Sequence, residues 1–401
     1  MGGNLVSKTK GDRVIWAIVV ILTLVSLLVV YSSTSSLAYK HDSYPERFLF
    51  KQFVFIIGGV LIIYFAHRVN YTIYSRIALI LFLISIPLLL YTLLFGRELN
   101  GGSRWIMLPV INMTFQTSDL AKLALFMYMS RQLSRKQNVI KDFKKGFLQI
   151  IVPIAIICLL IAPANLSTAV LVAGTSFLLM FIGRVNTKHI LITIGLAAIP
   201  VIILISVAAK YYDKEEHKTK DLPAIFATGR VPTWIGRIQT FMYSNKEDDN
   251  EKLYQINQAK IAIAKGGWFG RGPGRSEQRN FLPHSYSDFV FAIILEEYGI
   301  MGGLFIIFIY LLFLYRCIRL YRKCPYAFGA FLALALGFTI AIQAFSNMGV
   351  NVGAFPNTGV TLPLISLGGS SFLFTCLSIG IILSVARNVE QSEGNQTPSA
   401  P

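Results

Sequence analysis

The chain has 401 residues, of which 54% are hydrophobic and only 14% are charged, and its 37 basic and 20 acidic side chains give a formal charge of +17. Soluble domains carry about 25% charged residues, so this composition excludes an ordinary soluble enzyme. Apolar residues also gather in blocks of membrane-spanning length, such as residues 15–31, 77–95 and 190–209. The sequence therefore predicts an all-α polytopic membrane protein.

Ten apolar blocks, separated by charged or glycine-rich connections, predict ten transmembrane helices. In chain order these spans cover residues 14–34, 50–66, 77–95, 118–133, 147–163, 166–183, 188–209, 288–315, 326–350 and 366–386. We expect residues 1–13 to form a cytoplasmic N-terminus and 14–386 the membrane domain. The polar residues 387–401 are expected to form a disordered cytoplasmic tail.

The positive charges predict the orientation. With the N-terminus in the cytoplasm, eighteen Lys and Arg residues fall in or beside the inner loops, and the short outer loops hold five, Lys40, Arg47, Lys51, Arg97 and Arg104. Because an excess of Lys and Arg in short loops marks the cytoplasmic side, both termini are predicted to be cytoplasmic. The basic excess is then mostly a topology signal, and it gives little support to nucleic-acid binding.

The longest connection, residues 210–287 between spans 7 and 8, is predicted to be a large extracytoplasmic loop. Connections of this length in compact proteins are usually functional or disordered. Its charged parts, 210–221 and 244–252, indicate solvated surface. Residues 253–288 mix apolar side chains with glycines, and we expect them to fold back onto the membrane.

Polar residues at membrane depth are costly and are candidates for function. Here they are Lys122, Asn165, Asp288, Glu296, Glu297, Gln343, Asn347 and Asn351. Asp119 and Lys122 are three residues apart on one predicted helix, so an ion pair is available, and a structural role is favoured over catalysis. Glu296 and Glu297 are too far along or around the helix to pair directly with Asp288. We expect them to hold neighbouring helices by buried hydrogen bonds.

Asp288 stands where a proline-containing run gives way to an apolar helix. Two interpretations are open on these residues alone. Asp288 could cap the helix by accepting a hydrogen bond from a backbone amide. Alternatively, it could be a general base whose affinity for protons is raised by the apolar rings of Phe281, Tyr286 and Phe289.

Two glycine-rich runs frame the outer loops, residues 100–105 and 266–275, and neither ends in the Lys-Ser/Thr of a nucleotide-binding P-loop. Glycines let backbone amides approach an anion, and Arg104, Lys265, Arg271 and Arg275 suit a phosphate group. The alternative is that these runs are turns with solvated arginines. The five histidines are scattered over different loops and suggest no metal cluster.

Several of these runs together resemble the SEDS family (shape, elongation, division and sporulation), the FtsW/RodA-type polymerases of the bacterial cell wall. The resemblance covers nearly the whole chain. It rests on residues 100–106, Tyr254-Gln255, residues 270–274, Leu282-Pro283 with Ser287-Asp288-Phe289, residues 296–299, and residues 359–371, a broken run that resembles the division branch more than the elongation branch. The chain departs from the family pattern at Pro163-Ala-Asn165, at Gln116-Thr-Ser-Asp119, and at His284 and Tyr286.

The resemblance implies a ten-span glycosyltransferase that polymerises lipid II, an undecaprenyl-pyrophosphate-linked disaccharide-peptide, on the outer face of the membrane. It implies that Asp288 is the catalytic base, and that Arg104, Lys265, Arg271 and Arg275 bind the pyrophosphate. A divalent cation, Mg²⁺ or Mn²⁺, is expected from the substrate chemistry, and no organic cofactor is expected. The expected partners are a class B penicillin-binding protein and other division proteins, because the long loop has no nucleophilic Ser-x-x-Lys of its own.

Three alternatives stay open beside a septal polymerase. A lipid II flippase would also have polar residues and a broken helix inside the membrane. The other two are a polymerase of the elongation branch and a non-catalytic scaffold for division proteins.

Overall fold

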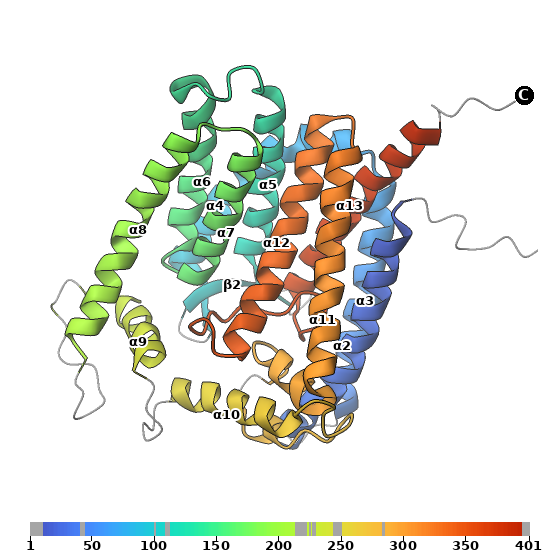
Figure 1. Ribbon diagram of the computed structural model, residues 1–401, viewed down its shortest axis with the longest axis vertical. Coiled ribbons are helices and arrows are strands. Elements are labelled where there is room, and N and C mark those ends of the chain that lie inside the picture. The colour runs from blue at the N-terminus through green and yellow to red at the C-terminus, as the bar shows by residue number, and fades with distance from the viewer. Residues whose placement is uncertain are drawn as a thin grey trace, which may run out of the picture.

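The computed structural model describes residues 11–40, 45–99, 102–108, 113–212, 223, 226, 230–243, 251–282 and 285–394. Over this part, the chain forms a bundle of long helices (Figure 1). The bundle helices are α2 (Arg13–Lys40), α3 (Pro45–Arg68), α4 (Tyr71–Phe95), α5 (Thr117–Arg135), α6 (Leu148–Ile161), α7 (Leu166–Ile182), α8 (Thr187–Lys210), α11 (Val290–Lys323), α12 (Ala327–Asn351) and α13 (Ser370–Gly394).

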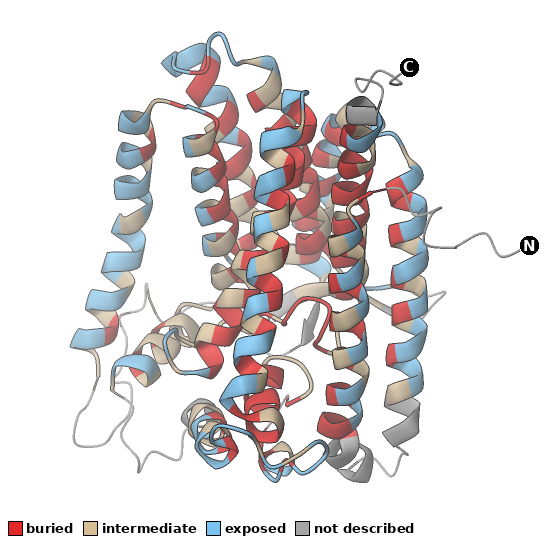
Figure 2. Cartoon of the chain, turned by 45° about the vertical axis from the view of Figure 1, so that its right-hand side comes forward, coloured by how far each residue is buried: buried red, intermediate tan, exposed pale blue. Residues whose placement is uncertain are grey.

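Each of the ten predicted spans falls on one of these helices. Among the described residues, eight helices are long and apolar enough to cross a membrane, and α7 is apolar but shorter. On α8, Leu191, Ile192 and Leu196 are 63%, 69% and 67% exposed, as expected for side chains that face lipid. Figure 2 shows this pattern of exposed outer faces and buried inner faces. The chain is an integral membrane protein, and the count of ten spans stays a prediction.

The core of the bundle is built around α12, which packs against α11, α5, α13 and α7. Small side chains make this possible, because helices without bulky residues at their contacts can approach closely. A Cβ at Gly337 of α12, for example, would lie 2.6 Å from Cys317 Cβ of α11. The close packing holds α12 between the helices that carry the polar residues described below.

The two ends of the bundle differ. The residues nearest the termini meet at one end, where Gly11 N donates to Glu390 Oε2 at 2.8 Å and Arg316 Nε donates to Asp12 Oδ2 at 2.7 Å. Helix α13 runs to Gly394, beyond the predicted end of the last span at 386, and residues 395–401 of the predicted tail lie outside the described residues. The opposite end carries α9 (Val231–Met242) and α10 (Glu251–Gly266) (Figure 1).

A small antiparallel sheet follows α4, with strand order β1-β2-β3. The strands are β1 (Arg97–Leu99), β2 (Gly102–Leu108) and β3 (Met113–Gln116), and Trp105 of β2 lies opposite Gln116 of β3. The backbone N–H of Gln116 donates to Ser370 Oγ at 3.0 Å, which joins the sheet to the first turn of α13. The sequence predicts only a glycine-rich loop here, because strands this short show little alternation of apolar and polar residues.

The second glycine-rich run docks on α11 where that helix is kinked at Gly299 (φ 69°). The kink breaks the helical ladder, and the loop replaces the lost hydrogen bonds. Arg271 N and Gly272 N each donate at 3.0 Å to the carbonyls of Glu296 and Glu297, and the amides of Ile300 and Met301 donate to the carbonyls of Gly267 and Trp268. A Cβ at Gly299 would lie 2.4 Å from Gly270 N. The loop and α11 therefore both need a glycine at the point where they cross.

Candidate active site

A polar cavity of about 400 Å³ lies inside the bundle. Side chains from the sheet, from α5, α7, α9 and α12, and from the segments before α11 and α13 line it. The charged residues in this lining are Arg104, Asp119, Lys122, Arg237 and Asp288. The structure therefore brings together residues that are far apart in the sequence and that lie on separate elements.

Asp288 belongs to the short segment that precedes α11. The N-cap of α11 is Phe289 and no side-chain hydrogen bond caps it locally, so Asp288 does not take the capping role that its sequence allowed. Ser287 Oγ donates to Asp288 Oδ1 at 2.9 Å. A Cβ added at Gly359 would lie 3.6 Å from Asp288 Oδ2 and 3.9 Å from Arg104 Nη1. The carboxylate and the guanidinium thus border the same small space.

Arg104 comes from β2, and its Nε donates at 2.8 Å to the carbonyl of Ala164, just after α6. Arg230 Nη1 donates to the same carbonyl. Burial, together with repulsion from Arg230 and Arg237, lowers the pKa of Arg104 to about 10, and Asp288 opposes this shift. Arg104 is therefore still cationic at neutral pH, in a place where like charges crowd together.

Arg237, from α9, also lines the cavity, although no motif in the sequence singled it out. Burial lowers its pKa, repulsion from Arg230 adds to this, and Asp288 opposes it. Arg237 makes no hydrogen bond or ion pair with the part of the chain that the structure describes. A signal was available, because Arg230 and Arg237 are seven residues apart, and that spacing puts two residues on one face of a helix.

The pair on α5 also lines the cavity. Lys122 Nζ lies 2.8 Å from Asp119 Oδ1, so the ion pair that the spacing allowed is formed. Both side chains are largely buried. Asn165, at which the sequence departs from the family pattern, caps α7, since its Oδ1 accepts from Thr168 N at 3.3 Å. Its polar role here is therefore local, although it too borders the cavity.

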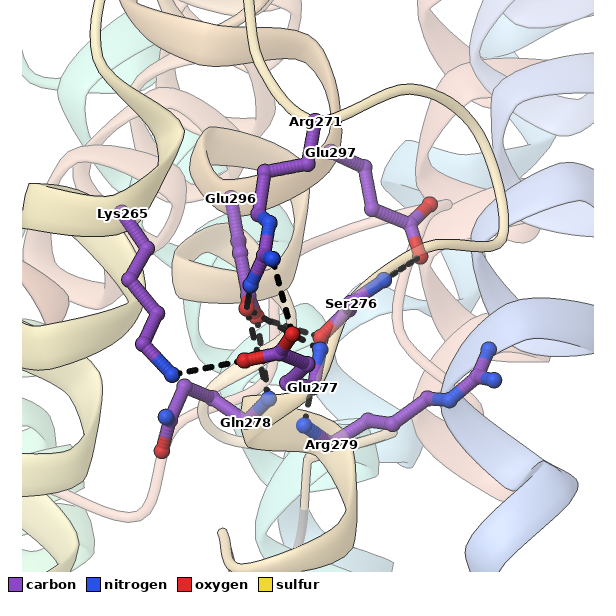
Figure 3. Close-up of polar contacts among 8 residues, drawn as sticks. All are labelled: Lys265, Arg271, Ser276, Glu277, Gln278, Arg279, Glu296 and Glu297. Atoms are coloured by element: carbon purple, nitrogen blue, oxygen red, sulfur yellow. Dashed lines mark hydrogen bonds and ion pairs between the residues drawn. The ribbon is translucent and has the colours of Figure 1, made fainter.

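The other predicted pyrophosphate ligands lie elsewhere, in what we call the Glu277 cluster, formed by Lys265, Arg271, Glu277 and Glu296 (Figure 3). Lys265 Nζ and Arg271 Nη2 lie 2.8 Å and 2.7 Å from the two carboxylate oxygens of Glu277. The hydrogen bond from Arg271, followed by that from Lys265, lowers the pKa of Glu277 to about 2. Neither cation lines the cavity, and Arg275 is exposed on the same loop.

Glu296 and Glu297 hold this loop to the helices, as Figure 3 shows. Glu296 is 0% exposed and accepts from Ser276 Oγ and from the backbone amides of Glu277 and Gln278. Glu297 accepts from Ser32 Oγ of α2 and from Ser276 N. The buried hydrogen bonds expected of both residues are present, and they join α11 to the loop and to α2.

A metal ion would find few ligands in this cavity. Nowhere in the described ranges do three or more His, Cys, Asp or Glu side chains gather to hold one, and His284 lies outside those ranges. Mg²⁺, however, usually takes one or two carboxylates and completes its shell with water and substrate phosphates. Asp119 Oδ2 is buried and has no hydrogen-bond partner among the described residues. This oxygen fits a cation that arrives with a phosphorylated substrate.

Comparisons with known proteins agree on one family. The model of the FtsW, RodA and SpoVE family, described as cell cycle proteins, matches residues 12–391. A probable peptidoglycan glycosyltransferase FtsW from Trichlorobacter lovleyi is 32% identical over 383 residues, which cover 94% of each chain. Stage V sporulation protein E from Bacillus subtilis is 30% identical, over 95% of this chain and 98% of its own.

Solved structures share the fold. A peptidoglycan synthase complex that coordinates polymerization and crosslinking contains a chain that matches with a TM-score of 0.72 and 22% identity, over 95% of this chain and 99% of that one. The rod shape determining protein RodA of Thermus thermophilus matches with a TM-score of 0.67 and 22% identity, over 95% and 98%. At this level of identity, the likeness concerns the arrangement of the helices.

Proposed function

The chain belongs to the FtsW, RodA and SpoVE family of cell cycle proteins, and on that premise we propose that it is a glycosyltransferase that polymerises lipid II during septal cell-wall synthesis. The observation that carries the proposal is the charge in the cavity. Asp288 is the carboxylate that raises the pKa of both Arg104 and Arg237, and Asp119 is already paired with Lys122. A cavity with more cations than carboxylates suits an anionic substrate.

Asp288 is the proposed general base. It would take the proton from the 4-hydroxyl of the acceptor sugar while that oxygen attacks the anomeric carbon of the donor, and the configuration at that carbon would invert. A carboxylate can do this only when it reaches the hydroxyl. Its place beside the Gly359 space, with Oδ1 already held by Ser287, supports the assignment.

Arg104 and Arg237 are proposed to hold the leaving pyrophosphate. Guanidinium groups suit phosphate oxygens because they offer several N–H donors in one plane. Burial and then repulsion from neighbouring arginines lower the pKa of each, and a dianion bound there would relieve that repulsion. No second carboxylate is needed as an acid, because pyrophosphate leaves readily once its charge is held.

Asp119 is the proposed protein ligand for a divalent cation, through the oxygen that Lys122 does not occupy. Mg²⁺ or Mn²⁺ bound there with the substrate would neutralise charge on the phosphate oxygens. The arginines and Asp288 have their proposed roles with or without it.

The proposed orientation places both termini in the cytoplasm and the cavity mouth, α9 and α10 outside. It rests on the predicted distribution of Lys and Arg in the short loops. The proposed partner is a class B penicillin-binding protein that would crosslink the new strands, and the likeness to a synthase complex supports this. Such a protein would act where the septum forms.

The test is glycan synthesis by the purified chain and its penicillin-binding partner from lipid II. We expect wild type to make glycan strands and Asp288→Asn to make none, because the amide cannot accept the proton. Glu277→Gln is the matched control, since it also neutralises one carboxylate but does so in the Glu277 cluster. Polymerisation by Asp288→Asn at the wild-type rate would refute the base assignment.

The same assay separates the rival functions. A flippase or a scaffold would give no glycan with wild type, and a flippase would still move fluorescent lipid II across a vesicle bilayer. Septal or side-wall localisation of a tagged chain distinguishes the division branch from the elongation branch.

A further inference from the structure

Two amides from α12 hold the backbone of Asp288. Asn347 Nδ2 and Asn351 Nδ2 donate to the carbonyl oxygen of Asp288 at 2.8 Å and 3.0 Å. The two residues are one helical turn apart, so they lie on the same face of α12, and both side chains are 1% exposed. Neither is among the residues that line the cavity. They therefore contact the backbone of Asp288 on the side away from the cavity, where a substrate does not reach them.

Asn351 also supplies a cap for α11 from a different helix. The backbone N–H of Ala292, in the first turn of α11, donates to Asn351 Oδ1 at 3.0 Å and is shared with the carbonyl of Phe289 at 3.1 Å. A capping acceptor for such an amide is usually the side chain of the N-cap residue. The N-cap here is Phe289, which has no acceptor, and Asp288 is the residue before it. Because Asn351 accepts this hydrogen bond, the carboxylate of Asp288 is left to face the cavity.

Asn347 also holds the segment that precedes α13, which lines the cavity. Its Nδ2 also donates to the carbonyl of Val360 at 2.7 Å, next to the glycine that separates Asp288 from Arg104. On the other side, Ser366 Oγ donates to the carbonyl of Ser287 at 2.7 Å. The backbone on either side of the carboxylate is thus fixed to α12 and to the segment that precedes α13.

We propose that Asn347 and Asn351 are positioning residues that fix the Asp288 carboxylate for proton transfer. This rests on the proposed function, in which Asp288 is the base. A displacement of about 1 Å in a catalytic group can cost about 100-fold in rate. Since neither asparagine reaches the cavity, their loss should lower kcat and leave the KM for lipid II within about twofold.

The experiment measures kcat and KM for lipid II with the chain and its penicillin-binding partner. The variants are Asn347→Ala and Asn351→Asp. The second keeps the size of the side chain and the oxygen that accepts from Ala292, but it replaces the amide that donates to Asp288. The control is Ser384→Ala, which also removes one buried hydrogen bond, from Ser384 Oγ to the carbonyl of Val69, at residues that do not line the cavity. Thermal unfolding gives the folded fraction of each.

We expect kcat per folded molecule to fall about 10- to 100-fold for both asparagine variants, with KM and the control unchanged. Wild-type kcat per folded molecule in Asn351→Asp would overturn the proposal, even if Asn347→Ala failed to fold. A rise in KM at constant kcat would also overturn it, because it would assign the asparagines to substrate binding. If wild type itself made no glycan, or Asp288→Asn remained active, the proposed function would fail instead.

Discussion

Arginine and carboxylate side chains gather in two places, the cavity around Asp288 and the Glu277 cluster. In the Glu277 cluster, both oxygens of Glu277 are bonded to cations, and Glu296 accepts hydrogen bonds from Ser276 and two backbone amides. In the cavity, Arg104 and Arg237 repel each other and share Asp288. We therefore assign the Glu277 cluster, whose charges are paired, to the scaffold, and we propose the cavity, where cations outnumber carboxylates, as the site for a charged ligand.

The largest effect is expected when one arginine of the cavity and one arginine of the Glu277 cluster are each replaced by alanine. Arg104→Ala should lower kcat/KM for lipid II about 100-fold, because losing one donor to a developing anion costs about that much. Arg271→Ala should lower it no more than about threefold, since Arg271 is bonded to Glu277. Steady-state glycan synthesis measures both. An equal loss of kcat/KM in the two variants would support the pyrophosphate-binding role predicted for Arg271, and would contradict its assignment to the scaffold.

The scaffold side can be tested through Glu296. Glu296→Gln replaces an oxygen that accepts buried amide hydrogen bonds with an NH₂ group, which should lower the free energy of unfolding by about 1–3 kcal/mol. Turnover per folded molecule should stay at the wild-type value. Thermal unfolding and glycan synthesis on the same preparation separate the two effects. Lost turnover in fully folded protein would contradict a purely structural role for the cluster.

The smallest expected effect concerns Glu277 and pH. Its lowered pKa, about 2 in the folded chain against about 4.3 when unfolded, means that its ion pairs stabilise the fold above about pH 4.3. That contribution should be lost as the pH falls toward 2. Glu277→Gln should therefore melt at most about 2 °C below wild type from pH 5 to 8, and the gap should close below pH 4. If the difference in melting temperature between wild type and Glu277→Gln grew as the pH fell, the stabilising role of the Glu277 ion pairs would be contradicted.

The sequence was sufficient for the long helices, because membrane spans are runs of apolar residues and need no tertiary information. It also predicted buried hydrogen bonds for Glu296 and Glu297, because helix geometry places both too far from Asp288 to pair with it. The base role of Asp288 stays a proposal. Arg237 could not be placed in the same way. The spacing from Arg230 puts the two arginines on one face of a helix, but Arg237 reaches the cavity only because α9 packs at that end of the bundle beside α8, and no local pattern encodes that packing.

The glycine-rich run at 266–275 shows the same limit from the other direction. Its sequence suited anion binding, yet the amides of Arg271 and Gly272 are used on α11 carbonyls. Asn351 is a second example, because its capping of α11 depends on the packing of two helices. Contacts between segments that are distant in the sequence could therefore not be predicted from local patterns. These contacts decide which charged residues remain available to a substrate.

The kink at Gly299 has a consequence for how the large connection between α8 and α11 can vary. Residues 267–272 complete the hydrogen bonding of α11 where it is kinked at Gly299, and a buried peptide group left unpaired costs about 1–3 kcal/mol. A deletion there would strip four main-chain groups of their partners at once. Insertions and deletions in this connection should therefore be rejected after α10, whereas before α10 they should be tolerated only outside α9, which carries Arg237.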